Sequence, residues 1–298
     1  MPELPDLLYI CDYLRRHVLG RTITAAELRQ PVVLRNAVGD PLGHALKSLT
    51  ITGIHIHGPF LRLTVSATLE LVINLMLAGQ IQHQRKPDRA LGHICVSLHL
   101  DDGTRLNICD QQKMAKVYLV HTGNDAVIPG FRTLGINVFS PDFTPEELRR
   151  RAAEHPRMQV RALINDRTIL DSIGNAYADE ILFAAQIHPK TLAGTLHPDE
   201  WVRLYGAIRD VMSDGVRAVA DARQPIHIKV RDHMRVRNRK GSPCPRCGST
   251  IRREGVRGYD VFFCPTCQPA RRRVFIDWKQ PPPADSPDTL RSDTDHSA

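Results

Sequence analysis

Apolar residues recur along this chain with two different periods, and the change of period divides the sequence into parts. Near the N-terminus, four apolar residues are spaced as on one face of a helix that Gly20 can end: Leu7, Cys11, Leu14 and Val18. Between about residues 22 and 120, short apolar segments alternate with turn residues, as at 61–65, 69–77, 94–100 and 105–109. This pattern is typical of an antiparallel β-sandwich or barrel. The first part of the chain therefore predicts a helix packed against such a sandwich.

The helical period returns after residue 140. Thr144 begins a capping box with Glu147, and Pro145 stands at the first helical position. A longer apolar stripe follows at Trp201, Leu204, Tyr205, Ile208, Val211 and Met212. After Gln224 the chain becomes basic and β-like, and its last residues are rich in Pro, Ser and Asp, a composition typical of disorder. We predict an α+β multidomain fold with parts at 1–128, 140–228, 229–276 and 277–298.

The charge distribution suggests a polyanionic partner. The formal net charge is +8, and residues 228–276 contain 13 Lys and Arg against three Asp and Glu. Such a compact basic module fits nucleic acid, although a solvated basic surface is the alternative. The sequence has no run of 18 apolar residues and its first residues lack the features of a secretory signal. We therefore expect no membrane association and a cytoplasmic protein.

Four of the seven cysteines form two Cys-x-x-Cys pairs, separated by 16 residues: Cys244, Cys247, Cys264 and Cys267. This is the spacing of a zinc ribbon, and the odd number of cysteines argues against paired disulfides. Four cysteine ligands leave no position for water, so the pattern predicts one structural Zn²⁺. The other three cysteines lie in apolar stretches and are expected in the core: Cys11, Cys95 and Cys109.

The second residue offers a candidate nucleophile. Removal of Met1 would expose the secondary amine of Pro2, whose pKa is lower than that of a lysine ammonium. Such an amine can form a Schiff base with a sugar aldehyde carbon, and Glu3 would lie within reach as a proton-transfer group. Because many proteins begin Met-Pro, this feature is weak when taken alone.

Three segments together resemble the formamidopyrimidine-DNA glycosylase/endonuclease VIII family, in the same chain order. They are the start MPELPD, the segment DSIGNAYADEILFAAQIHP at 171–189, and the terminal cysteine pairs. The family start is PELPE, with Asp6 here in place of the last Glu. The core of the family's helix-two-turn-helix is GxGNxYxxE, with Ser172 here in place of the first Gly. The resemblance covers about residues 2–268 and implies a catalytic β-sandwich, a helix-two-turn-helix DNA-binding domain and a zinc ribbon.

The resemblance also implies roles for individual residues. Pro2 would be the Schiff-base nucleophile and Glu3 the acid/base. Asn175 and the zinc hairpin would hold the backbone of a kinked duplex whose damaged base is flipped out. Arg239 matches a basic stretch of the family just before the zinc site.

Physical reasoning adds detail around the helix-two-turn-helix. Gly174 would permit close approach of the DNA backbone. The N–H groups at the helix start, together with the Asn175 side chain, could hold a phosphate. Glu180, one turn into the second helix, could fix the turn.

The departures from the family lie where the lesion should be read. The hairpin that carries a family lysine has Pro59 at that position, and Pro has neither a charge nor an N–H. Arg62 or Lys47 are candidate substitutes.

The residues that would fill the void left by the flipped base also differ. The family has a Met on one loop, where Leu77 stands here. On a second loop it has an Arg and a Phe, where this chain has Gln112 and Met114, and Lys113 keeps a positive charge between them. In the zinc hairpin, Tyr259 takes the position of the family arginine, and Arg257 lies two residues earlier; either could occupy the tip.

We therefore expect a monomeric bifunctional DNA glycosylase/AP lyase of base-excision repair that acts on damaged DNA, with a lesion range different from that of typical oxidised-guanine enzymes. One alternative is a lesion-binding protein of the same fold with lost or altered base excision. A generic zinc-ribbon nucleic-acid-binding module is another, but it ignores the Pro2 and Asn175 segments. The excised base, the choice between β- and β,δ-elimination and the preference for duplex or single-stranded DNA stay open.

Overall fold

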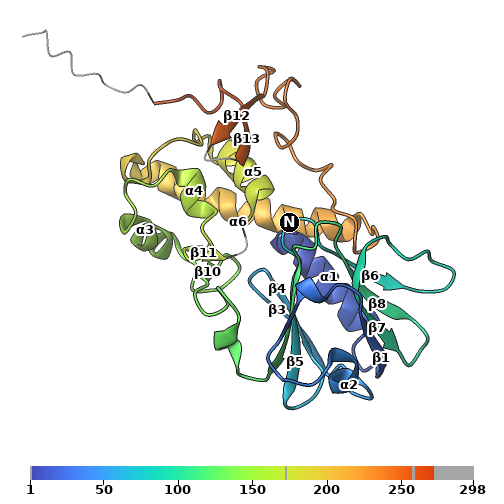
Figure 1. The fold of residues 1–298 in the computed structure, drawn as a ribbon. Coiled ribbons are helices and arrows are strands. Elements are labelled where there is room, and N and C mark those ends of the chain that lie inside the picture. Colours follow the sequence, from blue (N-terminus) through green and yellow to red (C-terminus); the bar gives the residue numbers. More distant parts are fainter. Residues whose placement is uncertain (1, 172, 257–258, 272–298) are drawn as a thin grey trace, which may run out of the picture.

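The computed structural model describes residues 2–171, 173–256 and 259–271. In Figure 1 a β-sandwich forms the lower half of the molecule, a group of helices lies above and to one side, and a short hairpin is at the top. Three predictions fall outside the described residues: Ser172, Arg257 and the tail at 277–298. The predicted fold class, a β-sandwich followed by a helical module and a four-cysteine zinc module, is confirmed.

Two sheets make the sandwich. The first has the strand order β1 (Ile23–Leu28), β7 (Ile94–Leu100), β8 (Arg105–Cys109) and β6 (Gln80–Gln84). The second has the order β2 (Leu34–Asn36), β9 (Lys116–His121), β5 (Leu69–Asn74), β4 (Phe60–Thr64) and β3 (Gly53–His57). All strand pairs in the two sheets are antiparallel except β2 with β9, which is parallel. After β1 the chain crosses from the first sheet to the edge of the second, where β2 lies. Apolar residues of both sheets and of the short helix α2 (Leu42–Leu46) fill the space between them.

Helix α1 (Leu4–His17) belongs to two cores at once. Its later residues, such as Ile10 and Leu14, are buried in the sandwich core, as the apolar spacing predicted. Its first residue, Leu4, is instead buried among the helices of the second module. The N-terminus of α1 is consequently placed at the junction of the two modules (Figure 1).

The helical module contains α3 (Pro145–Ala153), α4 (Val160–Ile164), α5 (Asn175–Ala185) and α6 (Pro198–Asp221). A short parallel pair, β10 (Ile136–Asn137) with β11 (Leu170–Asp171), completes it. The hydroxyl of Thr144 accepts a hydrogen bond from the Glu147 N–H at 3.2 Å, which confirms the predicted helix start. None of the helices in the described part of the chain is long and apolar enough to span a membrane.

The zinc module is a hairpin of β12 (Arg252–Val256) and β13 (Tyr259–Phe263) that lies against α5. Phe183 of α5 shares an apolar cluster with Val236, Ile251 and Phe262. The Gln268 side chain, fully buried, donates to the carbonyl of Ile187 at 2.9 Å. The module is therefore docked on the helices by both apolar and polar contacts.

Candidate active site and zinc centre

The carboxyl group of Glu3 lies at the start of α5. Its Oε1 accepts a hydrogen bond from the Ala176 N–H at 2.9 Å, and its Oε2 accepts one from the Tyr177 N–H at 3.1 Å. The N-terminal end of a helix stabilises a negative group in this position. The expected phosphate site at this helix start is therefore partly wrong, because Glu3 takes two of its N–H groups.

Burial makes Glu3 a candidate proton donor. Its side chain is buried, and desolvation raises its pKa above the ordinary value for glutamate. The two N–H groups and the positive charge of Arg231 act in the opposite direction but do not reverse the shift. A carboxyl with a raised pKa holds its proton at higher pH, which general-acid catalysis requires.

Gly174 lies against the Glu3 side chain. A Cβ at this position would lie 2.4 Å from Cδ and 2.5 Å from Oε1 of Glu3. The glycine therefore allows Glu3 to approach the helix, and its expected role in admitting the DNA backbone stays a prediction. A larger residue would displace the Glu3 carboxyl.

An ion pair secures the start of α1. The Asp6 carboxylate accepts two hydrogen bonds from Arg231, at 2.8 and 2.6 Å, and a third from the Glu3 N–H at 2.8 Å. Arg231 belongs to the linker between α6 and the zinc module. The linker thus fixes the backbone beside Pro2 and also brings a positive charge close to Glu3.

A cavity of about 390 Å³ opens beside Glu3, with Leu77 and Asn175 in its walls. The other polar residues that line it come from the linker and the segment after it: Lys229, Arg231, Arg237 and Asn238. Lys229, Arg231 and Arg237 were not singled out from the sequence. In the sequence, the basic composition of residues 228–276 is the one feature that points to these three residues. It does not indicate which of the 13 Lys and Arg in that segment face the site.

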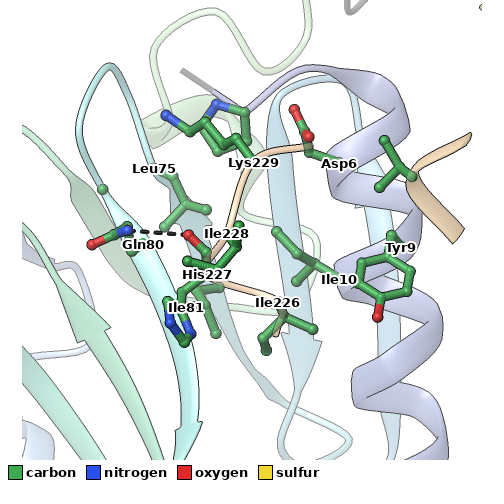
Figure 2. A pocket seen from close by; sticks show the side chains of 13 residues that line it. Asp6, Tyr9, Ile10, Leu75, Gln80, Ile81, Ile226, His227, Ile228 and Lys229 are labelled. Carbon is green, nitrogen blue, oxygen red and sulfur yellow. Dashed lines mark hydrogen bonds between the residues drawn. The ribbon is translucent and has the colours of Figure 1, made fainter. Parts of the chain in front are cut away.

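Pro2 lines a second, much smaller cavity of about 10 Å³. Figure 2 shows the linker residues Ile226 to Lys229 passing between α1 and β6, with the Gln80 side chain bonded to the His227 carbonyl at 3.1 Å. A volume of this size holds about one water molecule. The linker therefore fills most of the space beside Pro2.

The two loops expected to fill the void are placed differently. Leu77, at the turn between β5 and β6, is 55% exposed and lines the larger cavity. The loop between β8 and β9 is held by Asp110, whose carboxylate accepts from the N–H groups of Gln112 and Met114. Gln112, Lys113 and Met114 do not line that cavity; Gln112 and Lys113 are exposed and Met114 is half-buried.

The turn between β3 and β4, where Pro59 stands in place of the family lysine, packs against Leu134 in the segment that leads to the helical module. Gly58 and Pro59 are buried, and a Cβ on Gly58 would lie 2.4 Å from Leu134. Neither proposed substitute lies in the site. Arg62 donates to Glu70 at 2.6 Å within the sheet, and Lys47 follows α2 at the opposite end of the sandwich (Figure 1).

Asn175 is the first residue of α5 and lines the larger cavity. Its Oδ1 accepts from Arg161 and from Asn165, each at 3.1 Å. These bonds orient the amide, and Nδ2 is the donor through which this side chain can reach a ligand.

The acids that follow in α5 join the modules. Glu180 accepts from the backbone N–H groups of Arg235, Val236 and Arg237 at 2.8 to 2.9 Å, so the expectation that it fixes the turn is wrong. Asp179, with 0% exposure, pairs with Arg161 at 2.9 Å and with Arg237 at 2.7 Å. Asp179 was not identified from the sequence, because both of its partners are distant along the chain.

Arg239, expected in a DNA-binding stretch, folds back on its own loop. Its guanidinium donates to the carbonyls of Met234 at 2.6 Å and Asp232 at 3.1 Å. The residue is exposed. Arg239 therefore stabilises the loop at residues 232–239, and its expected contact with DNA stays a prediction.

The four cysteines of the two pairs converge on one point. Their Sγ atoms all lie within 4.8 Å of one another, with Cys244 to Cys267 at 3.9 Å and Cys247 to Cys264 at 3.5 Å. A tetrahedral zinc with Zn–S bonds of about 2.3 Å requires sulfurs roughly 3.8 Å apart. The residues fit one structural Zn²⁺, as predicted. The N–H groups of Arg246 and Cys267 donate to Sγ atoms, which suits thiolate ligands.

Comparison with known proteins agrees with this arrangement. The family model described as the formamidopyrimidine-DNA glycosylase N-terminal domain matches residues 1–117, and its H2TH domain matches 134–224. A zinc finger found in FPG and IleRS matches 241–270. The formamidopyrimidine-DNA glycosylase of Pelotomaculum thermopropionicum is 32% identical over 279 residues, covering 90% of this chain and 99% of the relative. That of Chloroflexus aurantiacus is 33% identical over 278 residues, covering 90% and 98%.

Solved structures show the same likeness. The MutM (Fpg) protein of Thermus thermophilus is 30% identical, with a TM-score of 0.78, covering 90% of this chain and 98% of that one. The Fpg of Lactococcus lactis, solved with DNA containing an abasic site, shares the fold with a TM-score of 0.81 at 23% identity, covering 90% and 100%. The chain belongs to the formamidopyrimidine-DNA glycosylase family, which confirms the family expected from the sequence.

Proposed function

We propose that this protein is a bifunctional DNA glycosylase/AP lyase of base-excision repair, which removes oxidised or ring-opened bases and then cleaves the strand. The observation that carries the proposal is the Glu3 carboxyl. It is buried, its pKa is raised, and it follows Pro2 directly in the chain. A candidate acid is thereby held beside a candidate amine nucleophile. The names of the relatives, which are formamidopyrimidine-DNA glycosylases, agree with this chemistry.

In the proposed reaction the Pro2 amine, freed of Met1, attacks C1′ of the damaged nucleotide. Glu3 gives its proton to the opening sugar ring, and the base leaves. The secondary amine forms a charged iminium directly, which acidifies the neighbouring sugar hydrogen. Loss of that hydrogen leads to strand cleavage by elimination.

The small cavity beside Pro2 sets a condition on this reaction. A base does not fit into about 10 Å³, so we infer that linker residues 226–229 move when a flipped nucleotide enters. Lys229 donates to the Leu77 carbonyl at 3.4 Å, a long and exposed bond that such a movement would break at little cost.

Damaged DNA is the proposed partner. Arg237 and Lys229 supply positive charge around the larger cavity, and Asn175 supplies an oriented amide. Leu77 is the proposed wedge that enters the base stack, because it is exposed at the tip of a turn and borders the same cavity. We propose that the zinc module adds backbone contacts through its basic residues.

Reductive trapping with cyanoborohydride on abasic-site DNA tests the nucleophile. Protein with Met1 removed is expected to form a covalent complex, and protein with Met1 retained is expected to form none. Lys229 also lines the small cavity, so Lys229→Arg, which keeps the charge without a Schiff-base amine, is the matched variant. Equal trapping with Met1 retained, abolished by Lys229→Arg, would make Lys229 the nucleophile.

The second candidate function is lesion binding without base excision. Pro59 in the closed hairpin favours it, since the family lysine is missing and neither Arg62 nor Lys47 replaces it at the site. Tight binding of lesion-bearing DNA with no trapped complex from Met1-free protein would establish this alternative.

A further inference from the structure

A third cavity, of about 540 Å³, lies further along α1 from Glu3. Tyr9 and Tyr13 of α1 form one wall, which places the cavity about 9 to 15 Å along the helix from Glu3. The remaining walls come from β6, from the loop after it at 85–91, and from linker residues 223–227. Tyr9, Ile226 and His227 also border the small cavity beside Pro2, so these residues separate the two spaces.

Arginines dominate the charge of this cavity. Arg85, Arg89 and Arg223 line it, and Asp88 is the one acid among the lining residues. In the described part of the chain, none of the three guanidiniums is paired with a carboxylate. The Asp88 carboxylate accepts the backbone N–H of Arg85 at 3.1 Å and so shapes the loop. Three cations against one anion leave the cavity positive.

A directed chain of hydrogen bonds holds Arg85 in place. The Thr104 hydroxyl donates to Asp102 at 2.7 Å, so it can only accept from Nε2–H of His83, at 2.9 Å. Nδ1 of His83 must then accept from the Tyr13 hydroxyl at 3.3 Å. The Tyr13 oxygen in turn accepts from the Arg85 guanidinium at 2.9 Å. Each donor and acceptor is thereby assigned, with the Asp102 carboxylate at one end and the Arg85 guanidinium, at the cavity, at the other.

The histidine in this chain is neutral. Burial, and then the charge of Arg85, lower the pKa of His83 to about 4. Arg85 also lies over the Tyr13 ring, 5.8 Å from its centroid. A guanidinium fixed in this way loses less conformational entropy when it binds an anion than a mobile one does. The cavity therefore combines a preorganised cation, two further arginines and two tyrosine rings.

We propose that this cavity binds the phosphate group of a nucleotide. The guanidinium groups match phosphate oxygens in geometry and charge. The rings of Tyr9 and Tyr13 offer apolar faces for the sugar or the base. The proposal does not depend on base excision, because the site is separate from Pro2 and Glu3. The nucleotide is either free or part of a bound DNA strand.

Isothermal titration of the full-length, zinc-loaded protein with 2′-deoxyguanosine 5′-monophosphate tests the proposal. We expect saturable one-to-one binding with a Kd of about 1 mM or below. Arg85→Gln combined with Arg223→Gln is expected to weaken binding at least about tenfold, since charge-assisted hydrogen bonds are lost. The matched control, Arg149→Gln with Arg157→Gln, removes the same charge from exposed positions on the helical module and is expected to bind like wild type.

Tyr13→Phe sharpens the test, because it keeps the ring but removes the hydroxyl that accepts from Arg85. We expect about threefold weaker binding. The source of the phosphate follows from repeating the titration with a short duplex containing an abasic-site analogue already bound. Undiminished binding identifies a free nucleotide, and displacement identifies the DNA strand. Absence of saturable binding to wild type, or equal binding by the Arg85/Arg223 variant and the control, would overturn the proposal.

Discussion

Two buried glutamates are associated with helix α5: Glu3, which bonds to its first turn, and Glu180, which belongs to it. The surroundings of the two carboxylates differ. At the start of α5, Glu3 receives two backbone N–H groups and borders a cavity of about 390 Å³. One turn further, Glu180 receives three backbone N–H groups and does not line that cavity. Burial raises the pKa of both groups. Burial and a raised pKa are therefore common to a structural and a candidate catalytic acid, and access to a ligand separates them.

The same helix shows a second contrast in how charge is compensated. Asp179 is met by two guanidiniums, which tie α4 and the segment before the zinc site to α5. Glu3 has no guanidinium partner at hydrogen-bond distance among the described residues, and Arg231 bonds to the neighbouring Asp6 instead. The proposed acid is thus kept apart from a direct ion pair, which would hold it ionised.

Neutralising each glutamate in turn tests whether Glu3 acts as the acid while Glu180 is structural. Glu3→Gln is expected to reduce base removal by about 10² to 10⁴-fold, the usual contribution of a general acid. Cleavage of a preformed abasic site should fall less, because no base has to leave. Glu180→Gln is the matched control, expected to lower the melting temperature but to keep activity per folded molecule. Single-turnover assays on both substrates measure this, and equal losses in the two variants would contradict the role of Glu3.

The pH dependence of base removal tests the same acid without a change in its environment. The protonated form of Glu3 is the proposed donor, and its pKa is raised. Because the Pro2 amine must at the same time be unprotonated, the rate should pass through a maximum and fall by up to about tenfold per pH unit on the alkaline side, where Glu3 has lost its proton. This falling limb should be absent in Glu3→Gln. A wild-type limb that survives the substitution would assign the titration to another group.

Asp179 is expected to matter for stability rather than for chemistry. Asp179→Ala leaves the buried Arg161 without its carboxylate partner and should lower the free energy of unfolding by about 3 to 5 kcal/mol. The exposed pair of Arg253 with Asp260 is the control, and Asp260→Ala should cost about 1 kcal/mol or less. Urea denaturation followed by circular dichroism distinguishes the two. Similar losses of unfolding free energy in the two variants would show that burial of the Asp179 ion pair does not increase its contribution to stability.

Gly174→Ala displaces Glu3 without removing it. The new Cβ would overlap the Glu3 side chain, and a misplacement of about 1 Å can cost about 10²-fold in rate. We expect a loss of that order in base removal, with DNA affinity close to that of wild type. If affinity falls and the rate per bound complex does not, the glycine serves the DNA backbone, as the sequence had suggested.

The smallest effect is expected at Asn175. Asn175→Ala should weaken binding about tenfold for all DNA sequences and lesions alike, since a phosphate contact carries no base information. Fluorescence anisotropy with several lesion-bearing duplexes measures this. A loss confined to one lesion would instead place Asn175 in lesion recognition.

Local patterns predicted much of this molecule because they report local contacts. The strand at 94–100 and the start of α3 at Thr144 follow from period and capping. The zinc centre follows from spacing, since each tight Cys-x-x-Cys turn carries two ligands. The role of Glu180 was misjudged, and the contact of Gly174 with Glu3 was missed, because the partners lie elsewhere in the chain. Glu3 is 173 residues from Ala176, and no local pattern reports such a pairing.

The pairing of Glu3 with the start of α5 also has a consequence during synthesis. A chain made from its N-terminus completes Pro2 and Glu3 long before residue 176 is added, and the sandwich can begin to fold in that interval. Until α5 arrives, the Glu3 carboxyl has neither the N–H groups nor the burial that define its final environment. A nascent or truncated chain therefore carries the amine without its acid. On the proposed mechanism, competence to excise a base therefore arises only after the helical module has been made and docked.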